Sequence, residues 1–324
     1  MQDLHQFQEI FEKYLAQNAF RDEPQSLYVP ANYILSLGGK RLRPAVLLLA
    51  NFLFDESVEK SLPAAFAIEV FHNFSLVHDD IMDAAPLRRG QFTVHNKFGL
   101  NAGILSGDVM LVKAYEALLT CHSPSILAVL KQFTKMAVQV CEGQQMDMDF
   151  ETNASVTLAD YLKMIELKTA VLLGTSLEIG ALIGGASIEN AQLLYEFGVN
   201  LGIAFQLQDD ILDAFGDPEK FGKKVGGDIA QRKKTFLYLK AMEVGSEDLK
   251  QKLTAWYQEN NSSEADKIKA VLAIFEEVGI KAIAEKAKQT YLQQAIAALN
   301  SVRAEAKRKK LLESFAYNLM ARES

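Results

Sequence analysis

Cysteine, proline and long apolar runs are all scarce in this sequence. The scarcity of cysteine argues against a disulfide-rich protein, and the lack of long apolar runs argues against a membrane protein. The only cysteines, Cys121 and Cys141, have neither metal-ligand spacing nor a second pair nearby, so we expect buried thiols in a reducing compartment rather than a disulfide framework. No uninterrupted apolar run reaches about 18 residues, and residues 1–14 carry acidic side chains without an apolar stretch. We therefore expect a cytoplasmic protein with neither a membrane span nor a secretory signal.

An excess of positive charge is also missing. The 34 Lys and Arg residues are outnumbered by 41 Asp and Glu residues, which gives a formal net charge of −7. This balance argues against nucleic acid as the main partner. Hydrophobic residues make up 49% of the 324 positions, which is enough for a sizeable core. We expect a folded protein whose local basic clusters bind a small anionic ligand.

Proline is confined to seven positions, none of them in residues 125–217 or 219–324, so long helices are permitted there. Helix-forming residues dominate these spans, and strict alternation with β-branched residues is scarce. Local signals for helix starts and ends occur at Gly38-Gly39, Pro44, Ser123-Pro124, Thr157 and Gly184-Gly185. No Ser- or Pro-rich linker divides the chain, so the prediction is an all-α fold in a single domain spanning residues 1–324.

The pentapeptide Asp-Asp-x-x-Asp is present twice, as Asp79-Asp80-Ile81-Met82-Asp83 and as Asp209-Asp210-Ile211-Leu212-Asp213. Both copies fall near the ends of long apolar helices predicted at roughly 62–83 and 188–215. About 3.6 residues per turn place the first and last aspartates of each copy on one face, where they could hold divalent cations. Acidic helix caps or solvated faces are the alternative for one copy, but recurrence in similar apolar contexts favours metal sites.

Basic residues form four clusters at predicted loops and helix ends, and phosphate is their obvious common partner. The clusters are Lys40-Arg41 with Arg43, Arg88-Arg89, Lys168, and Lys223-Lys224 with Arg232-Lys233-Lys234. Arg offers a planar donor fork to phosphate and Lys a compact charge, while Mg²⁺ bridges carboxylates to phosphates. We expect two diphosphates, one held mainly through metal and one by Arg, Lys and His72. A di-iron bundle is disfavoured because Glu69–His72 is the only Glu-x-x-His sequence.

Taken together, these motifs resemble the trans-type isoprenyl diphosphate synthases, the head-to-tail prenyltransferases that make geranyl, farnesyl, geranylgeranyl and longer diphosphates. Order and spacing agree from about residue 35 to residue 240. The matching segments are Gly38-Gly39-Lys40-Arg41-Leu42-Arg43-Pro44, Ser75 to Asp83, Leu87-Arg88-Arg89-Gly90, Gly143-Gln144-Gln145-Met146-Asp147, Lys168-Thr169, Phe205 to Asp213, and Gly222-Lys223 through Gly227-Asp228 to Lys233-Lys234-Thr235.

The resemblance implies a large helical bundle around a deep central cavity, usually as a homodimer, and a role for each motif residue. Three Mg²⁺ ions per active site are implied with substrate bound, held by Asp79, Asp80, Asp83, Asp209 and, less directly, Asp213. Contacts to the allylic diphosphate are implied for Arg88, Lys168, Thr169, Gln206, Lys223 and Lys233. Isopentenyl diphosphate would contact Gly39, Lys40, Arg41, His72 and Arg89. The presence of Lys224, where many relatives carry an uncharged residue, leaves open which of Lys223 and Lys224 reaches phosphate.

The implied reaction condenses isopentenyl diphosphate with an allylic diphosphate. Mg²⁺ with Arg and Lys donors would stabilise the charge on the departing diphosphate, and by resemblance that diphosphate would then accept the proton. Catalytic roles are implied for Asp79, Asp83, Arg88, Lys168, Asp209 and Lys223.

Product length in the resembling family depends on bulk at the fifth and fourth positions before the first aspartate, here Phe74 and Ser75. This pair and the uninserted motif favour a C20 geranylgeranyl product, with a C15 farnesyl product as the alternative. A class I terpene cyclase is disfavoured by the literal second Asp-Asp-x-x-Asp, and a non-catalytic partner subunit by the retention of both motifs. A structural helical protein with solvated acids is the remaining alternative.

Overall fold

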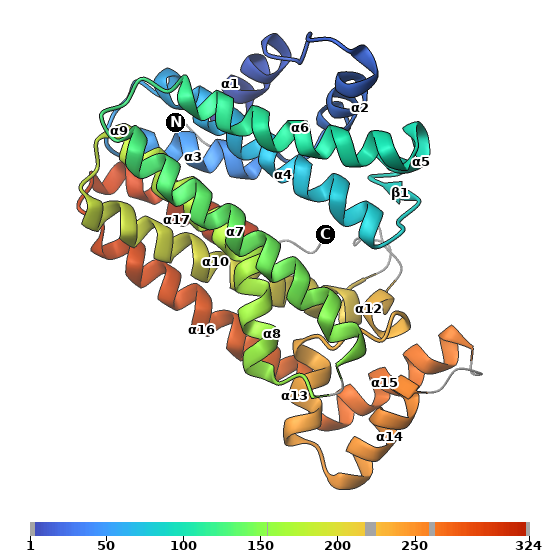
Figure 1. Cartoon of the computed structure of the whole chain (residues 1–324). Coiled ribbons are helices and arrows are strands. Elements are labelled where there is room, and N and C mark those ends of the chain that lie inside the picture. The colour runs from blue at the N-terminus through green and yellow to red at the C-terminus, as the bar shows by residue number, and fades with distance from the viewer. Residues whose placement is uncertain (1–3, 154, 218–224, 259–262, 322–324) are drawn as a thin grey trace. The chain divides into compact units, whose positions relative to one another are not determined.

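The structure is a computed structural model that describes residues 4–153, 155–217, 225–258 and 263–321. Helices dominate the described chain (Figure 1), as the sequence predicted. They are α1 (Leu4–Gln17), α2 (Gln25–Ser36), α3 (Leu42–Phe52), η1 (Glu59–Ser61), α4 (Leu62–Met82), α5 (Val94–Phe98), α6 (Leu100–Leu119), α7 (Ile126–Thr152), α8 (Leu158–Ile165), η2 (Glu166–Ala170), α9 (Val171–Gly184), α10 (Ile188–Phe215), α12 (Gly227–Ala230), α13 (Phe236–Val244), α14 (Glu247–Gln258), α15 (Glu264–Val278), α16 (Ile280–Ser301) and α17 (Ala306–Met320). A small antiparallel hairpin joins β1 (Leu87–Arg88) to β2 (Gln91–Phe92).

Local sequence signals explain where several helices begin and end. Thr157 caps α8 through a reciprocal capping box, in which its hydroxyl accepts from the backbone N–H of Asp160 at 3.2 Å. The carboxylate of Asp160 in turn accepts from the backbone N–H of Thr157 at 2.9 Å. Gly185, after α9, has a φ of +92°, a conformation that glycine adopts without steric cost. The predicted start at Thr157 and the predicted stop at Gly184-Gly185 are confirmed.

The chain forms two compact units, each built from segments far apart in sequence. Unit 1 comprises Met1–Met136, Leu172–Tyr195 and Ser301–Leu312. Unit 2 comprises Ala137–Val171, Glu196–Asn300 and Glu313–Ser324. The first aspartate motif therefore belongs to unit 1 and the second to unit 2. The expectation of a single domain around a deep cavity stays a prediction.

Aromatic side chains from three helices meet in the core of unit 1. The ring of Phe71 on α4 lies 5.4 Å from that of Phe133 on α7, and the ring of Tyr115 on α6 lies 5.0 Å from Phe133. Both contacts are edge-to-face, an arrangement that the quadrupoles of aromatic rings favour. Phe71 and Phe133 are fully buried, and each contributes about 1.5–3 kcal/mol by its removal from water. This cluster positions α4, which carries the first motif.

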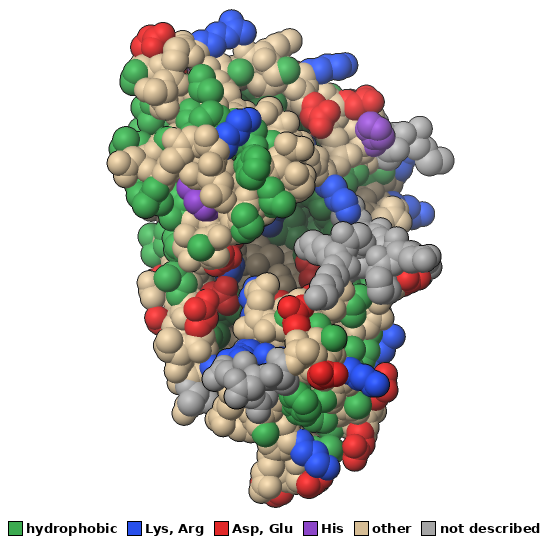
Figure 2. All heavy atoms as spheres, turned by 90° about the vertical axis from the view of Figure 1, so that its right-hand side faces the viewer, with side chains coloured by type: hydrophobic (Ala, Val, Ile, Leu, Met, Phe, Trp, Pro, Cys, Tyr) green, Lys and Arg blue, Asp and Glu red, His purple; other side chains and the backbone are tan. Residues whose placement is uncertain are grey.

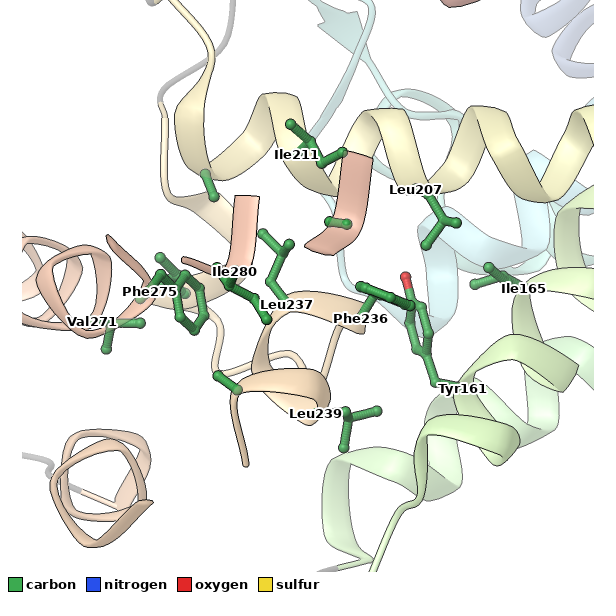
Figure 3. Close-up of a cluster of buried hydrophobic side chains, with 14 of the residues drawn as sticks. Tyr161, Ile165, Leu207, Ile211, Phe236, Leu237, Leu239, Val271, Phe275 and Ile280 are labelled. Carbon is green, nitrogen blue, oxygen red and sulfur yellow. The ribbon is translucent and has the colours of Figure 1, made fainter. Parts of the chain in front are cut away.

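The core of unit 2 surrounds the second motif. Figure 3 shows Leu207 and Ile211, from α10, above Phe236 and Leu237, from α13. The ring of Tyr161, from α8, lies beside Phe236 with its hydroxyl turned toward α10. All five side chains are buried. Buried apolar residues before and within the motif therefore hold α10 against α8 and α13.

One helical stretch, Leu158–Gly184, is long and apolar enough by length and composition to cross a membrane. In the structure, however, 89% of its apolar window is buried inside the protein. A helix apolar all round is expected either in a membrane or in a protein core, and the burial identifies this one as a core helix.

Charged side chains of both signs are interspersed on the face of the molecule drawn in Figure 2. Among the described side chains visible there, acidic, basic and hydrophobic groups alternate over short stretches of surface. This pattern agrees with the modest formal net charge of −7. A broad basic surface of the kind that binds nucleic acid is not seen among the described residues of this face.

Candidate active site

The first aspartate motif forms the last turn of α4. The backbone N–H of Asp83 donates to the carbonyl oxygen of Asp79 at 2.9 Å, so these two residues lie one helical turn apart. Asp83 is exposed and Asp79 partly exposed, whereas the side chain of Asp80 is only 1% exposed. Two carboxylates are therefore presented on one face, and the third turns inward.

Arg88, on the hairpin that follows α4, is the partner of Asp80. Its Nε lies 2.9 Å from Oδ1 and 2.8 Å from Oδ2 of Asp80, and its Nη2 lies 2.8 Å from Oδ1. The same Nη2 lies 3.6 Å from Oδ2 of Asp79. A bidentate pair with a buried carboxylate fixes the plane of a guanidinium group. Asp80 thus orients Arg88 beside Asp79, while the predicted metal role of Asp80 stays a prediction.

A basic cluster, made of Arg41, Arg43, Arg88 and Arg89 together with His72, lies within unit 1. Arg41 is buried, and its guanidinium donates to the carboxylate of Glu69 and to the carbonyl oxygen of Leu35. Arg89 donates to the carbonyl oxygen of Gly38, and a Cβ on Gly39 would lie 3.0 Å from the Arg89 guanidinium. The two Gly- and Arg-containing loops predicted as ligand-binding segments are therefore in contact.

The cations of this cluster depress one another's pKa. Burial first, and then Arg43 and Arg89, hold the pKa of His72 well below its ordinary value. Arg43 Nη1 lies 3.2 Å from Nε2 of the neutral His72, so the arginine donates and the imidazole accepts. Burial and Arg89 also lower the pKa of Arg43, and burial and Arg41 lower that of Arg89. Positive charge here exceeds what the nearby carboxylates offset, and a bound anion would relieve the repulsion.

The second motif also directs its central aspartate inward. Asp210 is 3% exposed, and its Oδ2 accepts from the hydroxyl of Tyr161 at 2.5 Å and from the backbone N–H of Phe236 at 3.3 Å. Oδ1 accepts from Nε2 of Gln206 at 3.3 Å. Burial raises the pKa of Asp210 to about 8, against the lowering by the Tyr161 hydrogen bond. Asp210 ties α8 and the start of α13 to α10.

Asp213 connects the second motif to the short helix α12. Its Oδ2 accepts from the backbone N–H of Asp228 at 3.0 Å, within the first turn of α12. The Nζ of Lys233 lies 4.0 Å from Oδ1 of Asp228, and Lys234 donates to the carbonyl oxygens of Phe150 and Asn153, at the end of α7, at 2.7 and 2.6 Å. Residues 225–235 are therefore hydrogen-bonded to α10 through Asp228 and to the end of α7 through Lys234. Lys233 lies beside Asp228 of α12.

Lys168 and Thr169 lie in η2, a π-helical turn between α8 and α9. The Nζ of Lys168 donates to Oδ2 of Asp147, on α7, at 2.6 Å. This approach requires Gly143, since a Cβ there would lie 2.3 Å from the backbone nitrogen of Lys168. π-Helical turns often mark functional sites, and this one positions a predicted phosphate ligand. The glycine of the Gly143-to-Asp147 segment thus has a packing role that its sequence alone did not reveal.

The structure brings some predicted residues together within each unit, and others lie outside the described residues. Within unit 1, Gly39, Arg41, His72, Arg88 and Arg89 lie in or against the basic cluster, and Lys40 is exposed at its edge. In unit 2, Gln206 contacts Asp210 and Lys168 contacts Asp147. Lys223 and Lys224, including the open choice between them, lie outside the described residues.

Four residues that hold the site were not assigned roles from the sequence, among them Asp147, which binds Lys168 and was noticed only within a matching segment. Glu69 entered only through the rejected Glu-x-x-His pattern, Tyr161 carried no motif, and Asp228 was noticed only within a matching segment. Their contacts span 28 positions for Glu69 with Arg41 and 49 for Tyr161 with Asp210. The only available signal was that acidic or hydroxyl groups on apolar helix faces need partners.

The chemistry of the carboxylates fits Mg²⁺ bound together with a phosphate ligand. Among the residues that the structure describes, no group of three or more His, Cys, Asp or Glu side chains could hold a metal ion. Each motif instead offers two aspartates one turn apart, Asp79 with Asp83 and Asp209 with Asp213. Mg²⁺ is usually bound by one or two carboxylates plus substrate phosphates and water, so paired oxygens suit it better than zinc.

A family described as polyprenyl synthetase matches residues 24–275. The chain therefore belongs to the polyprenyl synthetase family, and it is a prenyltransferase of the short-chain isoprenyl diphosphate synthase class. It is 45% identical over 224 residues, 68% of this chain and 69% of the relative, to the geranylgeranyl diphosphate synthase of Methanosarcina mazei.

Solved structures agree with this assignment and with the all-α fold. The crystal structure of a geranylgeranyl pyrophosphate synthase is 43% identical, covers 100% of both chains and superposes with a TM-score of 0.94. A polyprenyl synthase from Caulobacter crescentus, crystallised with calcium and isoprenyl diphosphate, is 26% identical with a TM-score of 0.87. That alignment covers 99% of this chain and 97% of the other.

Proposed function

We propose that this protein is a Mg²⁺-dependent synthase that condenses isopentenyl diphosphate with allylic diphosphates to a C20 geranylgeranyl product. The observation that supports it most is that each unit presents two aspartates one helical turn apart, with Arg88 beside Asp79 in unit 1 and with Asp213 bonded to the helix whose Asp228 lies 4.0 Å from Lys233 in unit 2. A structural relative crystallised with a divalent cation and an isoprenyl diphosphate adds support. A C15 farnesyl product is the second candidate.

The chain's own residues divide into donors and the groups that orient them. Bound Mg²⁺ supplies charge stabilisation to the departing diphosphate. Asp80 fixes the plane of the Arg88 guanidinium, which lies beside Asp79 and would donate hydrogen bonds to the same departing diphosphate. Lys168, placed by Asp147, offers an ammonium group to the allylic diphosphate, and the Arg43–His72 pair offers donors to isopentenyl diphosphate. Preorganised donors act most strongly where charge develops during bond cleavage.

Product length is assigned through Phe74, on α4. Its ring is buried, 5.5 Å from the ring of Phe71 and 4.9 Å from that of His78. Ser75 is small, and its hydroxyl donates to the backbone carbonyl oxygen of His72 at 2.8 Å. We infer that Phe74 limits the growing chain while Ser75 leaves room beside it. Replacing Phe74 by Ala should lengthen the product, and an unchanged product would refute this role.

A homodimer is proposed from the outer face of α6. Leu105, Val112 and Leu119 recur every seven residues and are 57%, 65% and 67% exposed. Such spacing places them on one stripe of the helix, as in helix–helix interfaces. Val112→Glu should shift the protein from dimer to monomer in size-exclusion chromatography with light scattering. Ile188→Glu, an equally exposed apolar position of unit 1, is the matched control and should leave the mass unchanged.

The direct test of the function is incubation with isopentenyl diphosphate, Mg²⁺ and each of the C5, C10 and C15 allylic diphosphates, followed by chromatographic sizing of the products. Elongation of no primer would refute the proposal. Asp79→Ala and Asp209→Ala should each lower turnover by orders of magnitude while the circular dichroism spectrum is retained. Glu277→Ala, an exposed acid on α15, is the control and should leave turnover unchanged.

We further propose a cytoplasmic location, which tagged-protein fractionation would test.

A further inference from the structure

Two glycines of α6 lie one helical turn apart against α4, which runs alongside (Figure 1). Both Gly103 and Gly107 are buried. A Cβ on Gly107 would lie 2.2 Å from Nε2 and 2.5 Å from Cδ2 of His78, separations that real Cβ atoms do not show. The imidazole of His78 therefore occupies the space that a side chain at position 107 would need.

Backbone and side-chain groups of α6 hold His78 in this position. Its Nε2 lies 3.2 Å from the carbonyl oxygen of Ile104 and 3.9 Å from Oδ1 of Asp108. Because a carbonyl oxygen only accepts hydrogen bonds, Nε2 carries the hydrogen that points to Ile104. The imidazole is thus held by a hydrogen bond to α6, and it fits there because Gly107 has no Cβ.

The imidazole of His78 is also in contact with Phe74. The two rings lie 4.9 Å apart at an angle of 68°, an edge-to-face contact one helical turn along α4. Phe74 also meets Phe71 at 5.5 Å, so its ring is bounded on two sides by aromatic groups. Buried rings in such contacts have few alternative orientations. His78 therefore restricts the space into which Phe74 can turn.

We propose that His78 and Gly107 are positioning residues that set product length through the Phe74 ring. The inference rests on the proposed function, in which Phe74 limits the growing chain. His78→Ala should free the Phe74 ring and raise the ratio of products longer than C20 to the C20 product about ten-fold. Ten-fold is the lower end of the discrimination that an apolar pocket provides. Gly107→Ala should displace the imidazole from its contact with Phe74 and so change the ratio of C15 to C20 product.

The test is a double-mutant cycle of wild type, His78→Ala, Gly107→Ala and the double variant. Product ratios are measured with a C10 primer and excess isopentenyl diphosphate. In the His78→Ala background the imidazole is gone, so Gly107→Ala should leave the ratio unchanged. Gly103→Ala is the matched control, because its nearest neighbours would be the terminal Cδ1 of Ile81 at 3.0 Å and the Cβ and Cα of His95 at 3.4 and 3.6 Å. It should leave the ratio as in wild type.

Thermal unfolding of the same variants gives a readout that needs no substrate. Gly107→Ala should lower the melting temperature in the wild-type background. In the His78→Ala background it should leave it unchanged or raise it, because Ala has the higher helix propensity. Equal shifts of melting temperature and product ratio in both backgrounds would overturn the coupling between Gly107 and His78.

The outcomes separate this inference from the function on which it rests. If wild type elongates no primer, the proposed function fails, and the unfolding cycle still tests the packing of His78 on Gly107. If Phe74→Ala alters product length but His78→Ala and Gly107→Ala do not, the function stands and the positioning role is refuted. If Phe74→Ala has no effect, the assignment of the length-limiting residue fails.

Discussion

Replacing Glu69 by Gln removes the negative charge from a buried ion pair while keeping the size of the side chain. Glu69 is 3% exposed and Arg41 is 6% exposed, and their side chains are in direct contact. Glu69 Oε1 also accepts from Nδ2 of Asn73 at 3.1 Å. The amide of the Glu69→Gln variant could still accept through its carbonyl oxygen, so the change isolates the charge of the pair.

The expected loss follows from what remains around Arg41. Its other acceptor is the neutral carbonyl oxygen of Leu35, so the buried guanidinium would lose the carboxylate that neutralises it. Breaking a buried pair by removing one partner costs about 3–5 kcal/mol, and the retained hydrogen bond favours the lower end. About 3 kcal/mol is a large part of the roughly 5–15 kcal/mol typical of a folded domain. The neighbouring cations of the basic cluster add to the loss because Glu69 offsets their charge.

Urea unfolding measures this loss. With a slope of about 3 kcal/mol per molar, as expected for a large chain, the midpoint should fall by about 1 M at unchanged slope. Glu305→Gln is the matched control, since the Glu305 side chain is 58% exposed and its pair with Arg308 at 3.1 Å is worth about 0–1 kcal/mol. A Glu69→Gln midpoint that moves no further than that of Glu305→Gln would refute the reasoning.

Three further predictions concern the buried side chains of Glu178 and Tyr161 and the partly exposed Lys234. Burial raises the pKa of Glu178 from 4.5 to about 7, so its contribution to stability is present at low pH and lost as the pH rises through 7. The free energies of unfolding of wild type and Glu178→Gln, measured between pH 5 and 8, should therefore diverge by about 3 kcal/mol. The variant should become the more stable of the two relative to wild type as the pH rises. Tyr161→Phe removes the hydrogen bond to Asp210, whose pKa of about 8 leaves it mostly neutral at pH 7, and should cost about 0.5–1.5 kcal/mol in urea unfolding at that pH; no loss would show that the bond contributes nothing net. Lys234→Met removes hydrogen bonds to the carbonyl oxygens of Phe150 and Asn153 and should cost about 1 kcal/mol. Lys240→Met, which removes only the ion pair with the half-exposed Glu243, should cost less than about 0.5 kcal/mol in the same assay.

The extents of the motif-bearing helices were predictable because their signals are local. The ranges expected at roughly 62–83 and 188–215 correspond to α4 at Leu62–Met82 and α10 at Ile188–Phe215. Pro63 lies in the first turn of α4, and Pro86 follows its end, so steric restrictions along a few residues determined both boundaries. No distant contact was needed for these predictions.

The partners of the charged residues were not predictable in the same way. Arg41 turns to Glu69, Lys168 turns to Asp147, and the hairpin that presents Arg88 has strands of only two residues each. Such pairs form where tertiary packing leaves a buried charge without water, so they depend on segments that the local pattern does not connect. The π-helical turn that carries Lys168 likewise has no simple periodic signal.

The different orientations of the three aspartates within each Asp-Asp-x-x-Asp motif, by contrast, are consistent with helix geometry. At about 100° per residue, the first and fifth positions lie about 40° apart, while the second lies about 100° from the first. The second lies about 60° from the fifth, so it can turn to a neighbouring element while the first and fifth face a ligand, and an unpaired carboxylate there would be costly. Asp80 and Asp210 meet that requirement with different partners, an arginine in one unit and a tyrosine with a helix N-terminus in the other. The repeated motif thus combines two carboxylates that we propose bind metal with a third that fixes the position of the helix end. The partner of the third carboxylate differs because each unit provides it from its own packing.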